Sequence, residues 1–166
     1  SGGMTLLSTT SLGSSTTTVT GISGSYNKLF VEVIDCFPGT AGALQLRFNT
    51  DATANAYQGI YNVYSADNTA GSQKAPYIDK ATAFYLTYGT MAAADNNNYT
   101  SFEIMNYASS TVRKVFNSLS VYKNLGANET LESSSGTWLN VAAITSLSII
   151  GAGAFSGGSI KIYGEK

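Results

Sequence analysis

Residues 157–166 read GGSIKIYGEK, and this closing segment does most to decide the fold. After the Gly-Gly turn, Ile160 and Ile162 point to one side of a strand, while Lys161 and Tyr163 point to the other. A strand this close to a chain end stays ordered only when its apolar side is buried in a sheet. We therefore expect a sheet that is completed by its last strand, with nothing catalytic after it.

The same two-residue period runs through most of the chain, as in residues 44–48, where leucine and phenylalanine alternate with polar side chains. Turn-forming clusters such as Pro38-Gly39 and the Asp-Asn-Asn-Asn run at 95–98 separate these segments. Roughly eight to ten short strands without an amphipathic helix predict an all-β fold, a two-sheet antiparallel β-sandwich of the jelly-roll type. The expected core consists of the apolar members of the alternating runs: Leu44, Leu46, Phe48, Phe102, Ile104, Leu119, Val121, Leu147, Ile149, Ile160 and Ile162.

Length and composition indicate one domain over residues 1–166, since 43% hydrophobic residues suffice for one core. Residues 1–4 allow two interpretations: Met4 is a start codon behind a tag remnant, or the piece follows a stalk in a longer polypeptide. The glycine-rich opening favours the stalk. Residues 51–76 form the irregular part, a long excursion with room for one short strand.

The charge and residue inventory excludes several function classes. Charged residues make up only 11% and the net charge is -1, which argues against nucleic acid as a partner. Without histidine, a Ser-His-Asp or Cys-His mechanism cannot be assembled from this chain. Cys36, the single cysteine, lies in an apolar strand and is expected to be buried and inert. No apolar run is long enough to predict membrane insertion, and assembly in a bacterial cytoplasm fits this inventory.

Aromatic residues are the best candidates for ligand contacts. A tyrosine ring offers a flat apolar face and a hydroxyl, which suits both sugar stacking and protein interfaces. Packing of these rings on their own domain is the competing interpretation. The candidates are Tyr57, Tyr61, Tyr64, Tyr77 and Trp138.

An oxygen-rich cluster after one strand is a weak candidate for a hard cation such as Ca²⁺. It contains Asn49, Asp51 and Asn55, but only one of the three is a carboxylate, so turn capping is the favoured interpretation. We expect no metal and no cofactor. The acidic residues are scattered, and the four glutamates before the C-terminal strand are expected to be solvated surface groups: Glu32, Glu103, Glu129 and Glu132.

Several segments together resemble the C-terminal β-sandwich domain of tailed-bacteriophage tail-fibre and virion structural proteins. They are residues 2–10 with 16–19, 26–29, 46–51 with 55–57, Trp138, 144–149, and 155–160 with Tyr163-Gly164. Each motif alone is common in sandwiches, and their order and spacing carry the resemblance. Residues 58–91 show none of it. The resemblance implies a virion protein that assembles in the host cytoplasm, and fibre ends of this kind are commonly three-fold.

Three functions remain open at this point. The first is a non-enzymatic virion structural protein, a fibre-tip or surface domain that binds host receptor or glycan, or other virion proteins, and that forms a homotrimer. The second is a carbohydrate-binding or adhesin sandwich of a cellular organism. The third, a glycan-processing enzyme, needs two acids facing one cleft, and no such pair is evident in the sequence.

Overall fold

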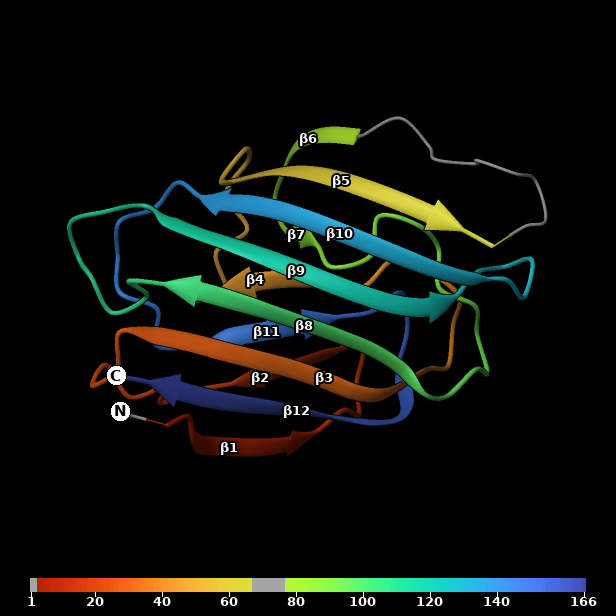
Figure 1. Ribbon diagram of the computed structural model, residues 1–166, viewed down its shortest axis with the longest axis horizontal. Coiled ribbons are helices and arrows are strands. Elements are labelled where there is room, and N and C mark those ends of the chain that lie inside the picture. Colours follow the sequence, from red (N-terminus) through yellow and green to blue (C-terminus); the bar gives the residue numbers. More distant parts are fainter. Residues whose placement is uncertain (1–2, 67–76) are drawn as a thin grey trace.

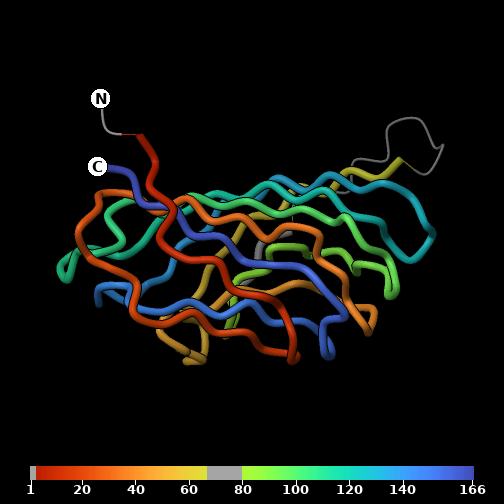
Figure 2. Tube along the Cα trace, turned by 90° about the horizontal axis from the view of Figure 1, so that it is seen from below, coloured from red at the N-terminus to blue at the C-terminus, as the bar shows by residue number. Residues whose placement is uncertain are grey.

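The computed structural model describes residues 3–66 and 77–166, and the side chains of residues 77–79 lie outside this description. Within these ranges the chain forms two antiparallel sheets and no helix (Figure 1). Figure 2 shows the sheets as two stacked layers. The predicted all-β, two-sheet antiparallel sandwich is therefore confirmed. In chain order the strands are β1 (Thr5–Ser11), β2 (Thr16–Val19), β3 (Lys28–Pro38), β4 (Gln45–Phe48), β5 (Tyr57–Ser65), β6 (Tyr77–Ala81), β7 (Phe84–Tyr85), β8 (Asn98–Met105), β9 (Lys114–Lys123), β10 (Glu129–Trp138), β11 (Leu147–Ile150) and β12 (Phe155–Glu165).

The larger sheet has eight strands in the order β1-β12-β3-β8-β9-β10-β5-β6, and the smaller has four in the order β2-β11-β4-β7. This division is less even than that of the eight-stranded jelly roll. β12 lies inside the larger sheet, where Ile160 pairs with Val33 and Ile162 pairs with Val31. Both isoleucines are fully buried, as expected from the alternation in the closing segment.

The core fills the space between the two sheets, and its centre is aromatic. The ring of Phe116 from the larger sheet lies edge-on to Phe48 and to Phe84 of the smaller one, with centroids 5.3 and 4.7 Å apart. The ring of Trp138 also belongs to this cluster, with its centroid 5.7 Å from that of Phe48. Edge-to-face aromatic pairs of this kind each add about 0.5–1.5 kcal/mol beyond the burial of their area.

The expected irregular excursion over residues 51–76 is wrong for much of its length. β5 pairs with β10 along its whole length, from Tyr57 opposite Trp138 to Ser65 opposite Thr130. Its outward positions mix Gln58 and Asn62 with Ile60 and Tyr64, so the strand does not show a clean period-two pattern. Residues 67–76 of that segment lie outside the described part of the chain.

The alternation of β9 is also opposite to the prediction. Leu119 and Val121, expected in the core, are 43% and 40% exposed, whereas Ser118 and Ser120 are buried. Phe116 and Tyr122 share the side of the strand that the two serines occupy. Burying two large rings removes more apolar area from water than burying Leu119 and Val121, and one register must serve the whole strand.

Ser120, one of the two inward serines of β9, has a partner because an irregular segment, residues 86–89, crosses the inner side of β9 and β10. The hydroxyl of Ser118 is buried without a hydrogen-bond partner among the described residues. The hydroxyl of Ser120 donates to the carbonyl of Leu86 at 2.7 Å. The hydroxyl of Thr87, in turn, accepts from the amide of Leu44 at 2.8 Å. Backbone outside a strand ladder needs such side-chain partners when it is buried, so polar residues on this inner face are required by the fold.

A glycine in β10 makes room for the aromatic centre and provides a test of it. A Cβ atom on Gly136 would lie 2.5 Å from Phe84 and 2.7 Å from Phe116. We expect Gly136→Ala to lower the free energy of unfolding by about 1–3 kcal/mol, as overpacked cores do. Gly13→Ala is the matched control, because nothing lies within 4 Å of the added carbon there. Urea unfolding of both variants measures the difference, and equal stabilities would contradict this account of the core.

Candidate functional site

Three of the five aromatic ligand candidates are core residues, which corrects the expectation that they are exposed to a ligand. Tyr57, Tyr61 and Trp138 are each at most 1% exposed. The hydroxyl of Tyr57 accepts from the amide of Phe48 at 2.9 Å and donates to the carbonyl of Asp51 at 3.1 Å. Their apolar faces pack inside the sandwich, so they offer no surface to a ligand in this structure.

The other two candidates differ from these. Tyr64 lies at the outward side of β5 and is 40% exposed. The backbone of Tyr77 opens β6, and its side chain lies outside the described part of the structure. Only Tyr64 therefore remains among the described candidates as a residue that a partner can reach.

The polar cluster proposed as a weak cation site caps turns instead. The amide oxygen of Asn49 accepts from the amides of Thr145 and Ser146 at 2.9 and 3.1 Å. The carboxylate of Asp51 accepts from the amide of Thr53 and from the indole of Trp138, at 2.9 and 2.8 Å.

The third member of the cluster, Asn55, is exposed and adopts a left-handed conformation with φ of 62°. Asparagine tolerates that conformation better than most residues, which fits a turn. Over the described residues, no group of three or more His, Cys, Asp or Glu side chains could hold a metal ion.

Cys36 is 1% exposed, and burial raises the pKa of its thiol to about 12. The thiolate, which is the nucleophilic form, is therefore scarce at neutral pH. The expectation that this cysteine is buried is confirmed. No helix in the described part of the chain is long and apolar enough to span a membrane.

Glu132 is a buried carboxyl that was expected on the surface. It is fully buried in β10, and its two oxygens accept from the amide of Tyr88 at 2.7 Å and from the hydroxyl of Tyr122 at 3.2 Å. The amide of Gly89 and the hydroxyl of Ser134 lie farther away, each at 3.4 Å. Burial raises the pKa of this carboxyl to about 7, and the hydrogen bonds oppose that rise.

This carboxyl holds the segment at residues 86–89 against the larger sheet, and it has no acidic partner among its contacts. The sequence gives no sign of its burial, because Leu131 beside it is the residue that an alternation argument places inside. Lys114 was missed for the same reason: its ammonium group is buried and donates to the carbonyls of Ser109, Val112 and Val141 at 2.7–3.0 Å.

The outward side of four adjacent strands of the larger sheet carries an unusual number of exposed apolar residues. We call this surface the outer face. Seven of its large apolar side chains are between 40% and 48% exposed: Ile60, Tyr64, Met105, Val115, Leu119, Val121 and Leu131. The full set of outward positions on β5, β8, β9 and β10 consists of Gln58, Ile60, Asn62, Tyr64, Tyr99, Ser101, Glu103, Met105, Val115, Asn117, Leu119, Val121, Lys123, Glu129, Leu131, Ser133, Ser135 and Thr137.

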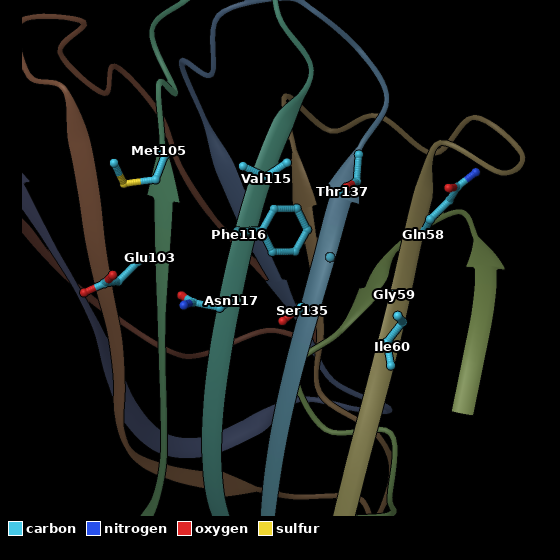
Figure 3. Close-up of a pocket in the computed structure, with 11 residues that line it drawn as sticks. Gln58, Gly59, Ile60, Glu103, Met105, Val115, Phe116, Asn117, Ser135 and Thr137 are labelled. Atoms are coloured by element: carbon cyan, nitrogen blue, oxygen red, sulfur yellow. The ribbon is translucent and has the colours of Figure 1, made fainter. Parts of the chain in front are cut away.

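A hollow of about 580 Å³ lies at one end of the outer face (Figure 3). Gly59 and Gly136 are paired across β5 and β10 at its floor, and a Cβ atom on either would point away from the hollow, towards the core residues Tyr61 and Phe84. The ring of Phe116, on the neighbouring strand β9, also lines the floor. Apolar and uncharged polar side chains surround it: Gln58, Ile60, Met105, Val115, Asn117, Ser135 and Thr137.

The chemistry that the hollow offers is binding chemistry. Glu103 is its one carboxylate, and the ammonium of Lys28 lies 3.8 Å from it. Hydrolysis of a glycosidic bond by the usual route needs a second carboxyl about 5–9.5 Å from the first, and the lining does not supply one. The hollow can therefore hold an apolar or neutral polar group, with amides and hydroxyls at its rim.

The raised pKa of Glu132 makes stability depend on pH. Between pH 4.5, its ordinary pKa, and about 7, the folded chain holds a proton that the unfolded chain has released. The free energy of unfolding should thus fall by about 3 kcal/mol as pH rises through this window. Glu132→Gln should remove that fall, while Glu129→Gln, an exposed glutamate of the same strand, should keep it. Urea unfolding at several pH values measures the slope, and a wild-type slope in Glu132→Gln would contradict the assignment.

The outer face and its hollow are thus the accessible features with the clearest capacity for contact, and the buried carboxyl serves the fold. Neither comparison with known proteins adds to this: no protein-family model matches the chain, and no curated protein sequence matches it.

Proposed function

We propose that this chain is a non-enzymatic structural domain of a bacteriophage virion, a fibre-tip or surface domain that works by contact. The observation that carries the proposal is the outer face, where large apolar side chains from four adjacent strands stay exposed. Contiguous exposed apolar surface of this kind marks interaction sites in soluble proteins. Copies of the chain, other virion proteins and host surface glycan are the partners that the proposal includes.

The arrangement of reactive groups supports the non-enzymatic part of the proposal. The chain has no histidine, and its single cysteine is buried with a raised pKa. Glu132, the carboxyl with a pKa near neutrality, is fully buried and engaged with backbone amides. A general acid or base must reach the substrate within hydrogen-bond distance, which neither of these groups can do as placed.

The virion part of the proposal rests on the resemblance to C-terminal domains of tail-fibre and virion structural proteins. Four of the segments with that resemblance form β1, β2, β11 and β12, which belong to both sheets. A three-fold assembly is likewise part of the proposal through the resemblance.

A carbohydrate-binding or adhesin module of a cellular organism is the second candidate. The hollow favours it, because a sugar ring has an apolar side and hydroxyls at its edge. Phe116, Val115 and Ile60 could receive the apolar side, while Asn117 and Gln58 could bond the hydroxyls.

Immunogold labelling distinguishes a virion protein from a cellular adhesin. Antibodies against the purified domain should label phage particles prepared from a lysate of the bacterium that encodes the chain. Pre-immune serum and particles of an unrelated phage are the controls. If cell envelopes are labelled and phage particles are not, the result would contradict the virion proposal and favour the adhesin.

A second measurement addresses catalysis. Incubation with purified envelope polysaccharides of the host should release no reducing ends above the background of the Glu103→Gln variant, because only one carboxylate lines the hollow. A commercial glycosidase serves as the positive control for the assay. Steady release by the wild type, lost in Glu103→Gln, would show that the chain is an enzyme.

A further inference from the structure

We propose that the outer face binds the outer face of a second copy of this chain around a two-fold axis. The proposal rests on the function proposed above and names the partner and the geometry of its contact surface. Four observations support it: a ridge, a hollow, the absence of charge between them, and the size of the surface.

The ridge crosses the four strands at one end of the outer face. Tyr64 of β5 pairs with Leu131 of β10, Leu131 with Val121 of β9, and Val121 with Tyr99 of β8. The first three are 40–43% exposed, and Tyr99 is half-buried, with its hydroxyl donating to Glu32 at 2.8 Å. Four large side chains therefore stand side by side in a single row.

The hollow occupies the other end of the same strands. The glycines of its floor lie five residues from the ridge: Gly136 on β10 is five beyond Leu131, and Gly59 on β5 is five before Tyr64. A middle row lies between them, in which Leu119 of β9 pairs with Ser133 of β10. A second depression of about 410 Å³ lies beside this row.

A two-fold axis that runs across the strands at the level of the middle row makes the surface complementary to itself. Such an axis lies parallel to the sheet and reverses the strand direction. The ridge of one copy then faces the hollow of the other, and the same contact occurs twice. Leu119 and Ser133, on the axis, face their own equivalents in the second copy.

The charge distribution favours a copy of the chain over charged partners. The charged outward positions lie at the margins of the four strands: Glu129 of β10 lies opposite Lys123 of β9 beyond the ridge, and Glu103 lies at the β8 border beside Lys28. Lys28 also contacts Glu165 at 2.5 Å, so this border is a cluster of opposite charges. Two such faces meet without like-charge repulsion and without burying an unpaired charge. Nucleic acid and anionic lipid, by contrast, would find Lys123 as the one cationic group on the outward positions of the four strands, opposite Glu129 and 3.7 Å from Asp95.

The size of the surface indicates a weak dimer. Four strands spaced about 4.8 Å apart, each with seven residues that rise about 3.4 Å, give a projected area of roughly 450 Å² per copy. Two copies thus cover roughly 900 Å², close to the lower limit of about 1,000 Å² for specific interfaces. We therefore expect dissociation in the micromolar range or above for the isolated domain, with higher avidity where copies are tethered in one particle.

Sedimentation velocity over a wide concentration range tests the proposal. The wild type should shift from 17.4 kDa at low concentration towards twice that mass at high concentration. Leu119→Lys and Leu131→Lys should raise the dissociation constant at least tenfold. Leu6→Lys, at an exposed leucine on the edge strand β1, is the matched control and should dimerise like the wild type. Circular dichroism verifies that all variants keep the fold, which substitution at sites more than 40% exposed should not disturb.

Cross-linking tests the two-fold axis independently. Cys36 is buried, so an introduced cysteine is the accessible thiol. Ser133→Cys lies on the proposed axis and should give a covalent dimer with a short bismaleimide. Val115→Cys lies towards the hollow end of the face, away from its own equivalent in the other copy, and should stay monomeric.

Each alternative result has a distinct meaning. A wild type that stays at 17.4 kDa at every concentration would overturn the proposal. An equal loss of dimerisation in Leu6→Lys and Leu119→Lys would overturn it as well. A species of three times that mass would replace the two-fold contact by a trimer. Co-sedimentation with neutral phosphatidylcholine vesicles in place of dimerisation would assign the face to lipid. None of these results bears on the immunogold experiment, so this inference can fail while the proposed virion role stands.

Discussion

The register of β9 and β10 is the constraint on which the rest of the structure depends. Side chains of a strand alternate between its faces, so the choice that brings Phe116, Tyr122 and Trp138 into the core settles the position of every neighbour. Ser118, Ser120 and Glu132 follow the rings inward, and Leu119 and Leu131 are turned to solvent. The aromatic core and the apolar outer face therefore have one common cause.

Two of the polar residues on the inner side, Ser120 and Glu132, have partners in an unusual element. The segment at residues 86–89 crosses the sandwich outside any strand, and its backbone bonds Ser120 and Glu132. Without this segment Ser120 would keep only the hydroxyl of Thr100, and Glu132 only the hydroxyls of Tyr122 and Ser134. A buried polar group that loses its partner costs about 1–3 kcal/mol. The segment and the polar residues beneath it thus require each other. Burial of the Glu132 carboxyl there, without a cation beside it, raises its pKa. The four surrounding hydrogen-bond donors lower that pKa, but by less than burial raises it.

The fold class and much of the core could be predicted from the sequence because a polar residue separates each pair of core residues in β4, β8, β11 and β12: Leu46 and Phe48, Phe102 and Ile104, Leu147 and Ile149, and Ile160 and Ile162. In β9 both sides are apolar, with Phe116 and Tyr122 on one and Leu119 and Val121 on the other, so alternation alone cannot choose between them. Tyr57, Tyr61 and Trp138 were expected near a ligand because the segment around the two tyrosines lacked the strand pattern. Their burial depends on pairing between β5 and β10, residues more than 60 positions apart, which local sequence does not reveal. The hollow, too, lies over two glycines, Gly59 and Gly136, that meet only through that pairing.

The pairing of β1 with β12 has a mechanical consequence. Thr5 lies opposite Gly164, so the first and last strands are antiparallel neighbours whose outer ends meet at one end of the sandwich (Figure 1). A pulling force applied between those ends acts across the strands and breaks their hydrogen bonds one pair at a time, as a zipper opens. Strands loaded along their length resist far better, because many bonds must then break together. A force applied between one chain end and the outer face would not separate β1 from β12 in this way.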